Sequence, residues 1–132
     1  MRVRCIRELP TSEQAEKLYP FYRPDTGQVF AVEVGTEYTV FSIDTGLPIP
    51  LLGIADDNGL LYPTPSCLFE IVDASLPALW VAHMNADGDL SLEPPSFNDF
   101  YFSDLADGEP AVVSDFRRVR DMLEPSTAAP DA

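Results

Sequence analysis

The sequence predicts a mainly β fold of the α+β class, a small antiparallel and partly open barrel with a short helix near each end of the chain. Three observations support this prediction. Runs of β-branched and aromatic residues recur at close spacing, with turn signals between them. No segment long enough for a crossover helix separates the central runs, which argues against a parallel sheet. Two segments with helical spacing lie near the ends of the 132-residue chain.

The N-terminal part predicts one strand and one helix. Val3 and Cys5 alternate with basic neighbours, which is typical of a short strand. Thr11 and Gln14 have the spacing of a capping box, in which each side chain accepts a hydrogen bond from the other residue's backbone N–H. We therefore expect a helix over Ser12–Leu18.

The central part predicts a series of strands joined by turns. The Asn58-Gly59 pair is the strongest hairpin signal in the chain, since both residues tolerate the positive φ of a tight hairpin turn. Pro63 and Pro65 are expected to separate the strand after this turn from the next one, because proline cannot donate a hydrogen bond to a sheet. The expected strands span residues 29–34, 37–43, 51–55, 60–62 and 68–72.

A corner and a further hairpin are expected next. Residues 76–80 resemble a tight corner that places Trp80 in the core. The Asn-Ala-Asp-Gly sequence at 85–88 is a turn signal, and it predicts a hairpin between residues 80–84 and 89–93.

The C-terminal part predicts a loop and a final helix. Residues 104–109 are polar and are expected to form a loop, and Ser114 is expected to be the N-cap of a helix with apolar residues at helical spacing. Residues 1–124 are expected to form a single domain, and 125–132 a disordered tail. The aromatic cluster at residues 97–102 has two interpretations, core packing or an exposed docking patch.

Charge is distributed unevenly along the chain. The net charge is −14, and residues 24–116 contain sixteen carboxylates without a single Lys or Arg. A field of this sign repels nucleic acid and anionic membranes, and it speeds the encounter with a cationic surface. The sequence therefore predicts a basic protein partner, and it argues against nucleic acid and membrane as partners.

Composition favours the cytoplasm. The basic N-terminus is not followed by an apolar stretch, so we expect no secretory signal. The longest apolar run contains prolines and is too short to cross a bilayer. Cys5 and Cys67 are expected to be buried thiols, because two distant cysteines make no disulfide framework.

No pattern of residues predicts catalysis, a metal or a cofactor. His83 is the only histidine and lies in an expected strand, where a structural role is the common one. Residues 85–89 resemble the start of a calcium loop, but Leu90 stands where the loop needs Gly and Ser96 where it needs Glu. An enzyme based on acidic side chains would need a pocket with two close carboxylates, one of them with a strongly raised pKa.

A set of motifs across residues 35–116 goes beyond generic β patterning. The most specific is Leu-Phe-Glu-Ile-Val-Asp at 68–73, followed by Leu76-Pro77 and Trp80. In their order these motifs resemble a family of small bacterial proteins with an SH3-like barrel, some of which are immunity partners of secreted polymorphic toxins. The resemblance implies an SH3-like barrel and supplies no catalytic residues. The remaining motifs are Gly35-x-x-Tyr38-x-Val40, Ile54-x-Asp56-Asp57-x-Gly59, Tyr62-Pro63, Phe102-x-x-Leu105-x-Asp107-Gly108 and Val113-x-x-Phe116.

The family segment also makes physical sense as structure. Leu68, Trp80 and either Ile71 or Val72 are expected in the core, while Glu70 and Asp73 are expected to stay outward or to cap the turn. The chain departs from the family in a proline-rich stretch at 47–50 and in its long acidic and aromatic C-terminal part.

The leading hypothesis for function is a non-catalytic immunity protein that masks the basic cleft of a cognate cationic toxin. One alternative is a DNA-mimic inhibitor, whose carboxylates imitate the spacing of phosphates, and another is an accessory domain whose acidity serves only solubility. Acidic turns and the acidic segment around the aromatic cluster form the predicted contact surface. Its residues are Asp56, Asp57, Asp87, Asp89, Asp99, Asp104, Asp107 and Glu109.

Overall fold

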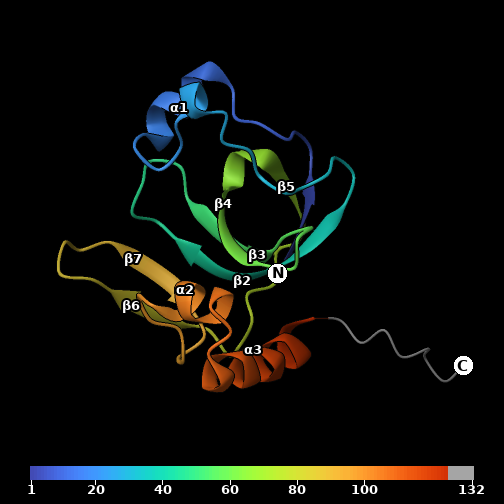
Figure 1. The fold of residues 1–132 in the computed structure, drawn as a ribbon, viewed down its shortest axis with the longest axis vertical. Helices are drawn as coiled ribbons and strands as arrows, with labels where there is room; N and C mark the ends of the chain where they lie inside the picture. The colour runs from blue at the N-terminus through green and yellow to red at the C-terminus, as the bar shows by residue number, and fades with distance from the viewer. Residues whose placement is uncertain (125–132) are drawn as a thin grey trace, which may run out of the picture.

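A computed structural model describes residues 1–124 of the chain, and the predicted tail at 125–132 lies outside the described residues. An antiparallel sheet occupies the centre, and α-helices pack around it (Figure 1). The strands are β1 Arg2–Cys5, β2 Glu37–Asp44, β3 Leu51–Ala55, β4 Leu61–Pro65, β5 Phe69–Asp73, β6 Val81–Met84 and β7 Leu90–Glu93. The helices are α1 Ser12–Leu18, α2 Tyr101–Ala106 and α3 Pro110–Leu123, with short 3-10 turns η1 Pro24–Thr26 and η2 Ser66–Leu68.

Strand β2 pairs with three other strands, β1, β3 and β7. The strand order is β4-β3-β2-β1-β5, and the β6–β7 hairpin joins through pairing of β7 with β2. Glu37 at the start of β2 is in register with β1, whereas Asp44 at its end is in register with both Leu51 of β3 and Ser91 of β7. The sheet curls strongly and does not close, so the predicted mainly β, α+β architecture is confirmed at this level (Figure 1).

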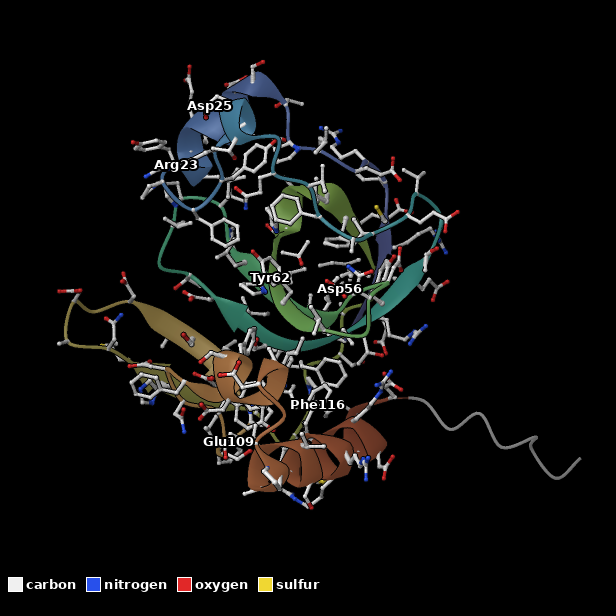
Figure 2. All side chains as sticks on the ribbon, viewed as in Figure 1. Arg23, Asp25, Asp56, Tyr62, Glu109 and Phe116 are labelled. Carbon is white, nitrogen blue, oxygen red and sulfur yellow. The ribbon has the colours of Figure 1, made fainter. Side chains whose placement is uncertain are left out.

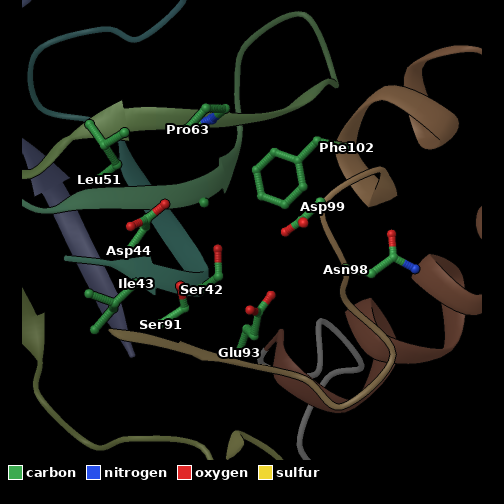
Figure 3. A pocket seen from close by; sticks show the side chains of 11 residues that line it. Ser42, Ile43, Asp44, Leu51, Pro63, Ser91, Glu93, Asn98, Asp99 and Phe102 are labelled. Atoms are coloured by element: carbon green, nitrogen blue, oxygen red, sulfur yellow. The ribbon is translucent and has the colours of Figure 1, made fainter. Parts of the chain in front are cut away.

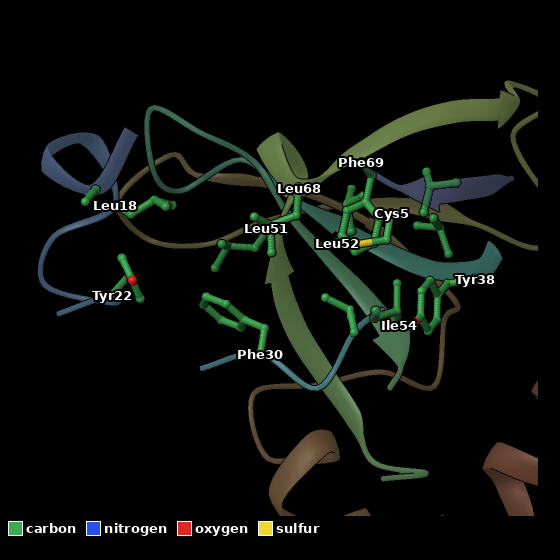
Figure 4. Close-up of a cluster of buried hydrophobic side chains, with 14 residues drawn as sticks. Cys5, Leu18, Tyr22, Phe30, Tyr38, Leu51, Leu52, Ile54, Leu68 and Phe69 are labelled. Atoms are coloured by element: carbon green, nitrogen blue, oxygen red, sulfur yellow. The ribbon is translucent and has the colours of Figure 1, made fainter. Parts of the chain in front are cut away.

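The two faces of β2 contribute to two hydrophobic cores, because successive side chains of a strand point to opposite faces. Val40 belongs to the first core, inside the curled sheet beneath α1 and residues 21–32 (Figure 4). Phe41 belongs to the second core, where its ring meets that of Phe116 from α3 at a centroid distance of 5.1 Å (Figure 2). Both Val40 and Phe41 are fully buried, so β2 is covered on both sides.

The elements signalled by the Thr11 capping box and by the Gly59 and Gly88 turns are confirmed. Helix α1 has the predicted bounds and the predicted capping box, with Gln14 N–H donating to Thr11 Oγ1 at 3.2 Å and Thr11 N–H donating to Gln14 Oε1 at 2.9 Å. The β3–β4 and β6–β7 hairpins turn at Gly59 and Gly88, whose positive φ angles of 77° and 84° suit glycine. Both cysteines are free thiols.

The predicted strand at residues 29–34 is wrong. Phe30 and Val32 are buried in the first core, but no part of this segment pairs in the sheet. Instead, Val32 N–H donates to the Phe30 carbonyl oxygen at 2.9 Å, and the Ala31 carbonyl oxygen accepts a bond from Asp57 N–H at 2.8 Å. The apolar residues of this run therefore fill the core from a loop.

The two prolines predicted to end a strand lie inside β4. Pro63 is in register with Gly53 of β3, and Pro65 with Leu51. Strand β4 is at an edge of the sheet, and its outer side pairs with no other strand. Proline is tolerated in such a strand because its missing N–H donor is not needed on the unpaired side. The next strand, β5, begins at Phe69 after η2.

The core residues predicted from the family segment are only partly buried. Leu68 is fully buried, but the side chains of Ile71 and Val72 are 59% and 41% exposed. Trp80 is half-buried and packs against the first core, so the predicted corner holds it at the margin of the core. Glu70 is exposed as predicted and pairs with Arg4 at 2.9 Å.

Two helices occupy the region where one was predicted. Helix α3 begins at Pro110, four residues before the predicted N-cap Ser114, and α2 covers part of the predicted loop. Proline is favoured in the first turn of a helix, where no backbone donor is needed. The aromatic cluster at 97–102 is mostly core: the rings of Phe97 and Tyr101 stack at 4.1 Å, while Phe100 is 70% exposed. Among the described residues, no helix has the length and apolar character needed to cross a membrane.

Candidate acidic pocket

A pocket of about 350 Å³ opens at the end of β2 (Figure 3). Strands β2, β3, β4 and β7 contribute its floor and sides, and residues 98–102 close it from the opposite side. Three carboxylates line it, Asp44 from β2, Glu93 from β7 and Asp99 from the segment before α2. They come from three different parts of the chain, and in Figure 3 their side chains are arranged around a common space.

Strand register explains why these residues meet. Asp44 is in register with Ser91, and the pairing of β2 with β7 runs antiparallel. Residues two apart on a strand share a face, so Ser42 and Asp44 of β2 lie on the same face as Ser91 and Glu93 of β7. The pairing of β7 with β2 thus builds the acidic pocket from strand ends that are remote in sequence.

The depth of the pocket depends on Gly53 of β3. A Cβ atom at this position would clash with Ser42 Oγ and would lie 3.0 Å from Cζ of Phe102. Only glycine lets Ser42 and the Phe102 ring approach β3 this closely, so the missing side chain is part of the pocket's construction.

Ser42 is a buried polar residue that points into this space. Its exposed fraction is 8%, and Figure 3 shows its hydroxyl directed toward the pocket. The other buried polar side chains have partners: Thr39 accepts from Arg2 at 3.1 Å, and Thr64 donates to the Tyr62 carbonyl oxygen at 3.2 Å. The Ser42 hydroxyl forms no hydrogen bond with any other residue of the described part of the chain, so it is free to bond to a ligand.

The pocket is strongly negative. Burial raises the pKa of Glu93 above its ordinary range, and the charges of Asp44 and Asp99 add to this rise, while His83 opposes it. No ion pair within residues 1–124 involves Asp44, Glu93 or Asp99. A cation in the pocket would relieve the repulsion among these carboxylates.

Two of the predicted contact residues lie at or beside this pocket. Asp99 lines it, and Asp89 lies close to Asp44, because a Cβ built on Gly46 would be 3.2 Å from Asp44 Oδ1 and 3.4 Å from Asp89 Oδ2. Asp87 is exposed at the turn of the β6–β7 hairpin. The structure thus brings Asp99 near Asp44 and Glu93, while its contact with a partner stays a prediction.

Asp56 and Asp57 lie at the other end of β3, away from the pocket. Asp56 Oδ1 accepts bonds from the N–H groups of Asn58 and Leu60, at 2.9 and 3.1 Å, and so shapes the β3–β4 turn. Asp57 Oδ1 accepts a bond from the Tyr38 hydroxyl at 2.7 Å. Burial and this bond to Asp57 raise the pKa of Tyr38 to about 12. Both carboxylates therefore have structural partners in their own surroundings.

The remaining predicted contacts follow the helices. Asp104 is within α2, Asp107 is its C-cap residue, and Glu109 is the N-cap residue of α3. None of the three lines the acidic pocket. The predicted set of acids is therefore spread over the β3–β4 turn, the β6–β7 hairpin and the α2 region.

Sequence reasoning missed Asp44 and Glu93. Neither residue is in the predicted contact set, and Glu93 is the last residue of the expected strand at 89–93. The available signal was the alternation of Ser91 and Glu93, which places both side chains on one face, but the partner strand could not be read from it.

Two other cavities are less suited to charged ligands. A pocket of about 500 Å³ beside α1 is lined mainly by apolar and aromatic residues, including Tyr19 and Tyr22. A smaller one, of about 290 Å³, contains Arg2 and Arg120 next to Glu37 and Glu124, so its charges are balanced. Within residues 1–124, no group of three His, Cys, Asp or Glu side chains is arranged to hold a metal ion.

The acidic pocket offers carboxylates, hydroxyls and one aromatic ring, which together suit an organic cation. Searches with family models, against curated proteins and against solved structures found no match to this chain.

Proposed function

We propose that this protein is a non-catalytic acidic binding protein that neutralises a basic protein partner, and specifically an immunity protein that covers the basic cleft of a cognate toxin in the cytoplasm. The observation that carries the proposal is the acidic pocket, where Asp44, Glu93 and Asp99 have no basic neighbour in an ion pair within residues 1–124. Asp44 Oδ1 accepts a bond from Gly46 N–H at 2.8 Å, but carboxylates without an internal ion-pair partner favour an external cation.

The contact surface is centred on this pocket and includes Asp89 beside it. The excess of negative charge would steer a cationic partner toward this face and reject nucleic acid and anionic membrane. Neutralisation then requires only that the bound protein blocks the partner's own basic site, and no reaction on this chain is needed.

The fold also supports the choice of partner. Strands β1–β5 form a curled, open antiparallel unit with η2 between β4 and β5, and we assign this unit to the SH3-like barrels. The Leu-Phe-Glu-Ile-Val-Asp segment, which resembles the immunity-type family, provides β5 at the edge of this unit. Toxin neutralisation is the role that this resemblance suggests.

Co-expression with the product of the neighbouring gene, followed by affinity capture, tests the proposal. We expect one dominant basic protein to co-purify at low salt and to be released as ionic strength rises. A pocket variant, Asp44→Asn with Glu93→Gln and Asp99→Asn, should lose the partner. A control variant with the same change in net charge, Asp25→Asn with Glu13→Gln and Asp121→Asn, should keep it.

Two results would contradict the proposal. One is a chain that stays alone at low salt when co-expressed. The other is an equal loss of partner in the pocket variant and in the control variant, since that would mean that overall charge alone holds the partner.

The raised pKa of Glu93 beside two other carboxylates supports a second candidate, an enzyme that uses these groups for acid–base chemistry. Titration of the purified protein into its partner separates the two functions. A binding protein reaches full neutralisation at one equivalent, whereas an enzyme that inactivates the partner does so well below one equivalent and keeps acting with time.

A further inference from the structure

Building on the proposed function, we infer that the acidic pocket receives the side chain of one arginine from the basic partner. The proposed function requires only a cationic surface. The pocket adds the identity of the side chain that enters: two properties of its lining favour arginine over lysine, and two more fit a single cationic side chain.

The carboxylates surround the space from several sides. Glu93 approaches from β7, Asp99 from the segment before α2 and Asp44 from the end of β2 (Figure 3). A guanidinium group has five N–H donors in one plane and can donate to two or more carboxylates at the same time. An ammonium group is a compact and strongly hydrated charge, so it satisfies such a distributed set of acceptors less well.

An aromatic ring forms the side of the pocket opposite the sheet. Phe102 of α2 points over Gly53, and its Cζ atom would be 3.0 Å from a Cβ at that position. A planar guanidinium stacks on an aromatic face and is easier to remove from water than an ammonium group. Ser42 and Phe102 leave no room directly above Gly53, so a flat cationic group would meet the ring from the open side of the pocket.

The hydroxyl of Ser42 provides an observation that is independent of charge. This side chain is more than nine-tenths buried, points into the pocket and forms no hydrogen bond within the described part of the chain. The Oγ atom itself is not sealed from solvent, so a ligand in the pocket can reach it. A donor N–H from a ligand would satisfy it, and the edge of a guanidinium carries such donors.

The size of the pocket limits the ligand. A volume of about 350 Å³ is at the lower end of the range for small-molecule sites, so it accommodates one side chain and not a folded peptide segment. The apolar parts of the lining, Leu51 and Pro63, suit the aliphatic stem that precedes the guanidinium.

A titration of the isotope-labelled full chain with blocked single amino acids tests this inference by NMR. The probes are the N-acetyl, N′-methylamide derivatives of arginine, of lysine and of citrulline, which has the shape of arginine without its charge. We expect the arginine probe to shift the amide signals of Ser42, Gly53 and Glu93. The lysine probe should bind at least about threefold more weakly, and citrulline should give no saturable shift.

Variants of the lining make the test specific. Glu93→Gln should weaken binding of the arginine probe by about tenfold, because a charge-assisted hydrogen bond is lost. Ser42→Ala should weaken it by about fivefold, the usual effect of one neutral hydrogen bond. The control Asp25→Asn removes one charge beside α1, at the far end of the molecule from α3, and should leave the affinity within about twofold (Figure 2).

Three results would overturn the inference: equal binding of arginine and citrulline, equal loss of affinity in Asp25→Asn and Glu93→Gln, or shifts spread over the surface without involving Ser42 and Gly53. The outcome is separable from that of the proposed function. A chain that captures the basic partner but does not bind the arginine probe keeps the proposed function and refutes the arginine site. A chain that binds neither refutes both.

Discussion

The two ends of strand β2 carry carboxylates in opposite electrostatic surroundings. At its start, Glu37 contacts Arg2 at 3.3 Å and Arg4 at 3.4 Å, and Arg4 also reaches Glu70 of β5 at 2.9 Å. At its end, Asp44 shares a pocket with Glu93 and Asp99, and no Lys or Arg among residues 1–124 lines it. The same strand thus has one end where the negative charge is neutralised within the chain and one end where it accumulates.

This difference shows how an acidic chain divides its charge between structure and recognition. The pairs at the start of β2 connect the three adjacent strands β2, β1 and β5, so they support the sheet even though each exposed pair contributes little. The carboxylates at the other end repel one another and lower stability. A partner that supplies a cation would recover that loss as binding free energy.

The largest effect is expected from Phe41→Ala, because this side chain packs the middle of β2 against α3 and so supports both ends of the strand. Phe41 is fully buried between β2 and α3, so its loss should lower the free energy of unfolding by about 3–5 kcal/mol. Urea denaturation would measure this. The exposed Phe100→Ala is the control, with an expected change within about 0.5 kcal/mol. Similar effects for both variants would mean that α3 does not pack on β2 in solution.

Gly53→Ala should affect the acidic end alone. The added methyl group would press on Ser42 and Phe102, which should lower the free energy of unfolding by about 1–3 kcal/mol and fill the pocket. At Gly46 the same substitution meets only the mobile ends of two carboxylates, so Gly46→Ala should cost less. Thermal unfolding of the two variants compares them, and equal costs would show that Gly53 does not hold the pocket open.

A matched pair of carboxylate-to-amide substitutions should change stability in opposite directions at the two ends. Glu37→Gln breaks two surface ion pairs and should lower the free energy of unfolding by less than about 1 kcal/mol, with the loss disappearing at high salt. Glu93→Gln removes a charge that burial and its acidic neighbours disfavour, so it should raise the melting temperature at neutral pH. Changes of the same sign would refute the contrast drawn here.

The smallest effect concerns pH. Because the pKa of Glu93 is raised in the folded protein, the unfolded chain releases this proton at a lower pH than the folded chain. The stability that protonated Glu93 provides is therefore complete below its ordinary pKa of 4.5 and is lost as pH rises through the folded value. The advantage of Glu93→Gln over the wild-type chain should appear above pH 4.5 and vanish below about pH 4. Melting curves across this range would show the change in advantage. An advantage independent of pH would mean that ionisation of Glu93 is not its cause.

Local signals in the sequence predicted the elements they control, and non-local packing decided the rest. The capping box at Thr11 and the glycine turns fix their own backbone geometry, so α1 and both hairpins follow from them. The run at 29–34 has strand-forming residues but no strand to pair with, and burial of Phe30 in the core explains its composition equally well. Pro110 marked the true start of α3, but Ser114 gave a competing capping signal.

Of the candidate site, only its negative charge could be predicted from the sequence. Excess negative charge is visible in the sequence, and it led to Asp99 and Asp89, which the structure brings to the same region. The pocket itself depends on the pairing of β7 with the last residues of β2 and on the close packing of Ser42 and Phe102 against Gly53. Neither a long-range register nor a missing side chain leaves a pattern in the local sequence.

The position of Trp80 gives this protein a built-in optical probe. It is the only tryptophan, and it packs against the first core, while its neighbour Leu79 packs against the second. Its fluorescence therefore reports on the curled part of the sheet, whereas far-ultraviolet circular dichroism also senses α2 and α3. Coincidence of the two signals during denaturation would indicate that both cores melt as one cooperative unit, and separate transitions would show that the helical side can detach while the barrel side stays folded.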